Sequence, residues 1–175
     1  PRSSSSAASD VYKRQEVHPV FLLFSMFFFV VFASITGSAV RDAIFLIHYD
    51  KTYLPIMYLF VAITMILIIN IYNRINKGKS QQFLLIITGI IFSITLIAFQ
   101  FFLSGIAIPL FYVWIEIITI FSVMQFWLVT GEIFNSRQAK RIFPLIIAGG
   151  SLAAILSGYS IKPVSYTHLT LPTTK

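Results

Sequence analysis

Glu116 is the residue of this sequence whose type and setting most strongly indicate chemistry. It stands in FYVWIEIITIF, about ten residues and therefore about 15 Å into an apolar stretch. A carboxylate at such a depth in a bilayer costs about 2.5–3.5 kcal/mol on insertion scales, so it usually faces a cavity or a partner. We therefore predict a role in substrate binding or proton coupling. The alternative is a structural carboxyl that is hydrogen-bonded between helices.

A second pair of charges, Arg41 and Asp42, ends the first long uncharged run of the chain. The planar guanidinium of Arg41 is suited to binding an anionic group, which makes both residues candidates for substrate binding. Alternatively, Arg41 snorkels to the outer interface and Asp42 simply pairs with it. Because neighbouring side chains on a helix point about 100° apart, Arg41 and Asp42 could bind one ligand together only if the helix is interrupted at this position. The assumed depth of Arg41 near the interface also argues against direct contact with Glu116.

Small residues recur every four positions in AGGSLAAILSG, at Gly150, Ala154 and Gly158. Such a stripe allows a neighbouring helix to approach closely, and we expect helix packing there. A phosphate-binding loop at Gly149–Gly150 is the weaker interpretation, because no Lys-Ser/Thr follows and no strand precedes it.

Basic residues cluster at Arg137, Lys140 and Arg141, where we expect a cytoplasmic loop whose charges anchor the topology. Contact with anionic lipid or phosphate is the alternative. The three histidines show no metal-ligand spacing with carboxylates, and no Ser-His-Asp arrangement is arguable. The sequence thus predicts no catalytic residue, no metal, no cofactor and no enzymatic activity.

Composition identifies the elements that must position these residues. The chain has 175 residues, of which 57% are hydrophobic and 11% charged, and its mean hydropathy is +0.85. Soluble domains are about 25% charged. Residues 20–40 and 80–115 carry no charge, and runs of about 18 or more apolar residues are what a bilayer requires. The net charge of +7 lies between apolar runs, so it indicates membrane topology and no nucleic-acid partner.

We predict an all-α, polytopic transmembrane bundle of about five spans within a domain at 16–163. Span one is expected at 19–40, with a possible continuation to His48 because AIFLI follows the charged pair. The other spans are expected at 54–72, 82–103, 107–130 and 143–162. No alternation typical of barrel strands is present.

Orientation follows from the Lys and Arg residues of short loops. Six lie in loops two–three and four–five, and only Arg41 and Lys51 lie in the other two. This bias places the N-terminus in the cytoplasm, with the protein expected in a bacterial inner membrane.

The two ends, 1–15 and 164–175, differ in composition from the middle and resemble translated adapter sequence. We expect foreign or disordered tails that pack against nothing, and a chain cut short near Pro163 whose C-terminal half is missing.

The segment 114–158, WIEIITIFSVMQFWLVTGEIFNSRQAKRIFPLIIAGGSLAAILSG, resembles the nucleotide transporter family that includes the ATP/ADP translocases of plastids and intracellular bacteria, especially its bacterial relatives. VRDAIFLIHYDKTYLPIMYLF, at 40–60, is similar to the end of the first span and the start of the second in that family. The resemblance covers nearly all of 20–162. It departs at Gly131–Glu132, where the translocases often carry Asn-Asp.

This resemblance implies the N-terminal half of a fold like that of the major facilitators, in which two halves enclose a central cavity. It maps the family's functional membrane charges to Arg41 and Glu116. The expected function is that of a secondary transporter for nucleotides or other anionic metabolites, with the lipid bilayer and a small anionic substrate as partners. The alternative is a membrane sensor or anchor that transports nothing.

Overall fold

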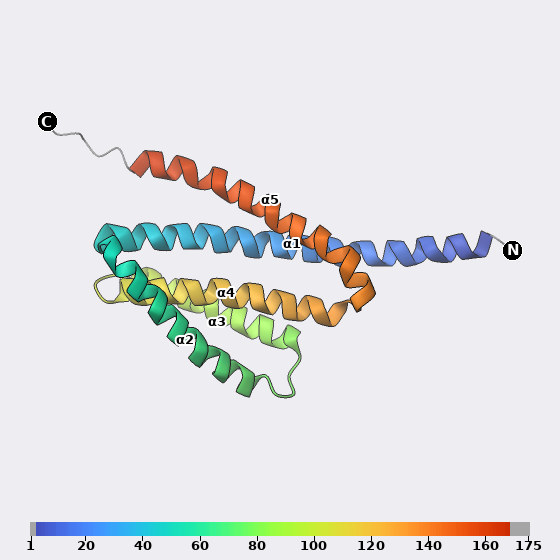
Figure 1. The fold of residues 1–175 in the computed structure, drawn as a ribbon, viewed down its shortest axis with the longest axis horizontal. Coiled ribbons are helices and arrows are strands. Elements are labelled where there is room, and N and C mark those ends of the chain that lie inside the picture. Colours follow the sequence, from blue (N-terminus) through green and yellow to red (C-terminus); the bar gives the residue numbers. More distant parts are fainter. Residues whose placement is uncertain (1–2, 169–175) are drawn as a thin grey trace. The chain divides into compact units, whose positions relative to one another are not determined.

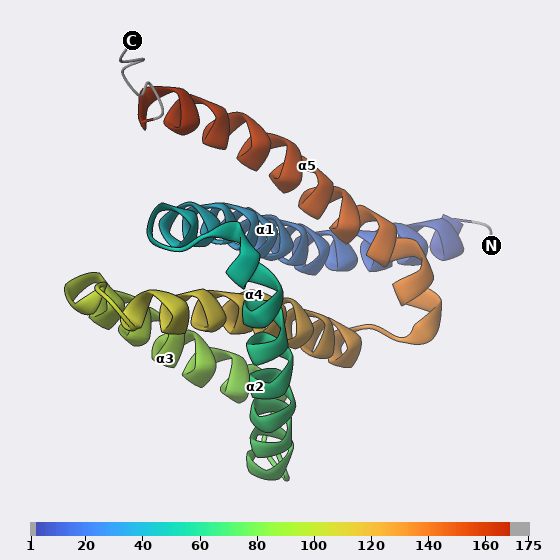
Figure 2. The same cartoon turned by 60° about the vertical axis from the view of Figure 1, so that its left-hand side comes forward.

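The structure is a computed structural model that describes the backbone of residues 3–168 and the side chains of residues 18–135 and 137–161. Within residues 3–168 every regular element is a helix, as Figures 1 and 2 show. This confirms the predicted all-α class. The elements are α1 (Ser3–His48), the 3₁₀ helix η1 (Lys51–Tyr53), α2 (Leu54–Ile75), α3 (Gln81–Phe102), α4 (Ala107–Ile133) and α5 (Ser136–His168).

Polar and conformationally permissive residues set the ends of these helices. The Asp50 side chain caps η1 by accepting a 2.8 Å hydrogen bond from the Thr52 backbone N–H, which holds the pKa of Asp50 below its usual 3.8. Ser80 caps α3 through Phe83 N–H at 3.3 Å. Gly78 and Gly105 adopt φ values of 81° and 52°, which reverse the chain after α2 and before α4 at little steric cost.

Three predicted spans agree with the observed helices to within three residues at each end: 54–72 with α2, 82–103 with α3 and 107–130 with α4. The first differs, because α1 does not end at Val40 but continues through Arg41 and Asp42 to His48. No Gly or Pro follows the charged pair within α1, and a charge does not stop a helix when it finds a partner. The continuation to His48 is therefore the correct boundary.

The predicted tails differ partly from the structure. From Ser3 onward the first is helical and continues into α1, since no Gly or Pro interrupts 3–18. Helix α5 likewise extends to His168, beyond the expected end near Pro163. The expected absence of packing at 1–15 and 164–175 concerns side chains outside the described residues. Their foreign origin stays a prediction.

The chain divides into two compact units, one formed by 33–129 and the other by 1–32 with 130–175. In the 33–129 unit, the buried core joins Phe45 of α1 to one face each of α2, α3 and α4. Aromatic rings dominate the contacts: Phe45 lies 4.9 Å from Tyr112, and Tyr72 lies 4.8 Å from Phe121, measured between ring centroids.

In the second unit, α5 packs on the N-terminal part of α1 through two glycines. A Cβ added to Gly149 would lie 2.8 Å from the backbone carbonyl oxygen of Phe24. One added to Gly150 would lie 2.6 Å from the ring of Phe27. Only residues without a side chain allow the two helices to come this close.

Five helical segments are long and apolar enough to cross a membrane: residues 18–48, 51–75, 81–102, 107–133 and 137–161. Large apolar side chains cover their outer faces, such as Phe29, Leu59, Ile86 and Leu110, each more than half exposed. Such surface is stable in lipid and unfavourable in water. The protein is a multi-pass membrane protein whose helices contact the bilayer.

Candidate functional site

Arg41 and Glu116 form an ion pair in the 33–129 unit, with Nη1 of Arg41 facing Oε2 of Glu116. The Arg41 side chain is 5% exposed and that of Glu116 is 23% exposed. The structure thus brings together the two residues that the sequence singled out from helices α1 and α4. The expectation that Arg41 lies too near the interface to reach Glu116 is wrong, because α1 carries it seven residues inside the helix end at His48.

Asp42 completes this site from its position next to Arg41 in α1. Its Oδ1 lies 3.0 Å from Nε of Arg41, which donates to it, and 2.8 Å from Nη2. The expected pairing of Asp42 with Arg41 is therefore confirmed, although their backbone directions differ by about 100°. The flexible guanidinium, buried rather than snorkelling to an interface, reaches both carboxylates.

Tyr112 covers the guanidinium on one side. The Cζ atom of Arg41 lies 4.3 Å from the centre of the Tyr112 ring, a cation–π distance. Tyr112 itself is fully buried between the rings of Phe45, at 4.9 Å, and Tyr58, at 6.4 Å. Tyr112 lies four positions before Glu116 on the same face of α4, and this spacing in the sequence could have indicated that the two residues share a site.

The electrostatics of the site follow from the charges of its three members. One guanidinium faces two carboxylates, so with all three ionised the cluster carries a net charge of −1. Asp42 is 44% exposed, whereas Glu116 is more enclosed at 23%. The arrangement can hold a proton, exchange one carboxylate for another anion, or lock α1 to α4.

Polar contacts between α3 and α4 were not predicted as part of any site. Thr88 Oγ1 donates to Oε1 of Gln125 at 2.7 Å, and Trp114 Nε1 donates to Oγ1 of Thr95 at 2.8 Å. Both hydrogen bonds join two apolar helices, where a polar group needs a partner. The presence of polar residues such as Thr88 and Gln125 inside apolar spans is the sequence feature that could have predicted these contacts.

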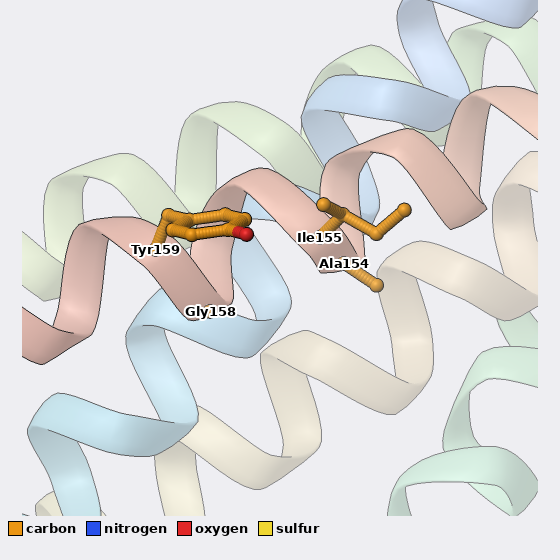
Figure 3. A pocket seen from close by; sticks show the side chains of 4 residues that line it. All are labelled: Ala154, Ile155, Gly158 and Tyr159. Carbon is orange, nitrogen blue, oxygen red and sulfur yellow. The ribbon is translucent and has the colours of Figure 1, made fainter.

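The small-residue stripe is only partly used for packing. Gly150 contacts α1 as described, but a Cβ at Gly158 would meet nothing within 4 Å, and Ala154 is exposed. Together with Ile155 and Tyr159, these two residues line a shallow pocket on α5 (Figure 3). The buried side of α5 instead follows Ile146, Gly150, Ala153 and Ser157. The predicted packing is therefore seen at Gly150 and not at Gly158.

Arg137, Lys140 and Arg141 lie in the first turns of α5, where all three side chains are exposed. The expectation of a loop at these positions is wrong, because α5 already begins at Ser136. Helix and loop are equally compatible with topology-setting charges, since the positive-inside rule counts residues near span ends.

Among the residues that the structure describes, no group of three His, Asp or Glu side chains is arranged to hold a metal ion. Comparisons with protein-family models, with curated proteins and with solved structures found no match. The resemblance to the nucleotide transporters stays a prediction, and the argument for function depends on the site itself.

Proposed function

We propose that the chain forms part of a secondary membrane transporter for a small anionic metabolite, with nucleotides the class indicated by the family resemblance. The observation that carries this proposal is the Arg41–Glu116 ion pair within two apolar helices. Ionisable residues are rare in spans, and they mark substrate pathways and proton relays.

The geometry supports transport over a purely structural role for the pair. Asp42 already neutralises Arg41 from the same helix through two contacts. Glu116 joins α4 to α1 and also gives the cluster one negative charge more than a neutral ion pair between helices would carry. A pair that opens and closes is the kind of element that alternating access uses.

The proposed setting is a bacterial inner membrane with the N-terminus in the cytoplasm. The basic-residue count supports this orientation more strongly once Arg41 is assigned to the interior of α1, because Lys51 is then the one Lys or Arg in the two short connections on the opposite side. In the proposed transporter, a C-terminal half supplies the second wall of the cavity.

Uptake measurements test the proposal. Bacteria that produce the chain together with its proposed C-terminal half are given labelled nucleotides and other anionic metabolites, and the Glu116→Gln variant of this protein is compared with the parent. We expect uptake to fall by at least about tenfold, equivalent to about 1.4 kcal/mol, with membrane expression unchanged. Glu132→Gln, which removes an exposed carboxylate from the same helix, is the matched control.

Uptake that is equal in the parent and in Glu116→Gln would show that Glu116 is structural. Absence of uptake for every anion tested in the parent would favour the sensor or anchor function instead.

A further inference from the structure

We propose that Glu116 takes up one proton and that this protonation opens its ion pair, releasing part of the Arg41 guanidinium for an anionic group. The inference deepens the proposed function and rests on it for the identity of that anion. Proton uptake itself depends only on the geometry of the site.

The first step is the unequal sharing of the guanidinium. Asp42 takes both Nε, at 3.0 Å, and Nη2, at 2.8 Å, whereas Glu116 faces Nη1 alone. Losing Glu116 therefore leaves Arg41 paired, while losing Asp42 removes two contacts at once. Protonation of Glu116 therefore removes fewer contacts from Arg41 than protonation of Asp42 would.

The second step is enclosure. The Asp42 side chain is 44% exposed and that of Glu116 is 23% exposed, so the protein encloses Glu116 more fully. Burial disfavours the charged form of a carboxylate, so of two carboxylates that share one cation we expect the more enclosed one to take up the proton. Both steps select Glu116.

The third step is that, in the described part of the 33–129 unit, Arg41 is the one cation for which an ion pair with Asp42 or Glu116 is seen. Of the elements packed in the 33–129 unit, α1 contributes Arg41 and Asp42, α2 contributes Tyr58, and α4 contributes Tyr112. Helix α3 carries no charged residue from Gln82 to Phe102. Arg41 alone must balance two carboxylates, which leaves one negative charge that a proton can neutralise.

The consequence is an exchange reaction at Nη1 of Arg41. The Glu116 carboxylate binds a proton to become a neutral carboxyl, and the cluster changes from a net charge of −1 to zero. An anionic substrate group then meets a guanidinium with a free edge and no excess negative charge. Loss of the proton restores the Arg41–Glu116 pair and displaces the anion.

Infrared difference spectroscopy of the purified chain in lipid nanodiscs tests proton uptake without any transport assay. A band from a protonated carboxyl should appear as the pH is lowered, before the bands of the remaining Asp and Glu side chains, and should vanish in Glu116→Gln. It should persist in Glu132→Gln. In Asp42→Asn the cluster is neutral with Glu116 ionised, so the band should appear only at lower pH.

An early band that persists in Glu116→Gln, or no early band in the parent chain, would overturn the inference while leaving transport by another mechanism possible. A shift to higher pH in Asp42→Asn would overturn it as well. An early band in a protein that takes up no anion would instead refute the proposed function and leave the proton site established.

Discussion

The guanidinium of Arg41 is held by two carboxylates and one aromatic ring, and this unequal arrangement determines what each side chain contributes to stability. Removing one partner of a buried pair costs about 3–5 kcal/mol when the other charge is left unpaired. Loss of Arg41 leaves both Asp42 and Glu116 without a cation, whereas loss of Glu116 leaves Arg41 bound to Asp42. The two ends of the same ion pair are therefore not equivalent.

We predict that Arg41→Gln lowers the unfolding temperature in lipid nanodiscs much more than Glu116→Gln, with a loss approaching about 3–5 kcal/mol for the arginine alone. Adding Glu116→Gln to Arg41→Gln should recover stability, because it removes one of two unpaired negative charges. Thermal unfolding of both single variants and the double variant measures this coupling. Equal losses that simply add would contradict the shared-guanidinium geometry.

Close approach of α5 to α1 depends on Gly149 and Gly150, and the remaining glycine of the stripe provides a control on the same helix. Alanine at Gly149 would place its Cβ 2.8 Å from the backbone oxygen of Phe24, which cannot move like a side chain. Overpacking of this kind costs about 1–3 kcal/mol and exceeds the gain in helix propensity of about 1 kcal/mol.

Gly149→Ala should therefore destabilise the protein, whereas Gly158→Ala should be neutral or stabilising, since nothing lies within 4 Å of its added Cβ. Unfolding temperatures of the two variants, measured side by side, decide this. A loss of stability in Gly158→Ala as large as that in Gly149→Ala would contradict the packing seen for α5.

The sequence predicted the helices far better than the contact between them. Uninterrupted apolar runs and the loop residues around Gly78 and Gly105 located α2, α3 and α4, because span length is a property of the local sequence. The Arg41–Glu116 pair was missed because the charge of Arg41 was interpreted as a span boundary. Whether a charge lies at the end of a helix or within it depends on a partner 75 positions away, which periodicity does not reveal.

Successive spans cross the membrane in opposite directions, so the five spans predict which connections lie on the same side of the membrane. We expect the α2–α3 connection on the cytoplasmic side and the α1–α2 connection on the opposite side. The chain contains no cysteine, so single variants such as Asn76→Cys and Thr52→Cys report one position each. In intact cells, an impermeant thiol reagent should label the second and spare the first; the reverse pattern would show an inverted orientation.

Helices α1 and α4 meet at positions 41 and 116, and thiol cross-linking can detect this contact. The Arg41→Cys/Glu116→Cys variant is treated with a short bifunctional thiol reagent, and a protease site inserted between α2 and α3 separates α1 from α4 after cutting. We predict that the two fragments stay linked. Arg41→Cys/Ile118→Cys, whose second cysteine points about 200° away on α4, should give separate fragments. Separate fragments for the 41–116 pair in a stably folded protein, or equal linkage in both variants, would contradict the account.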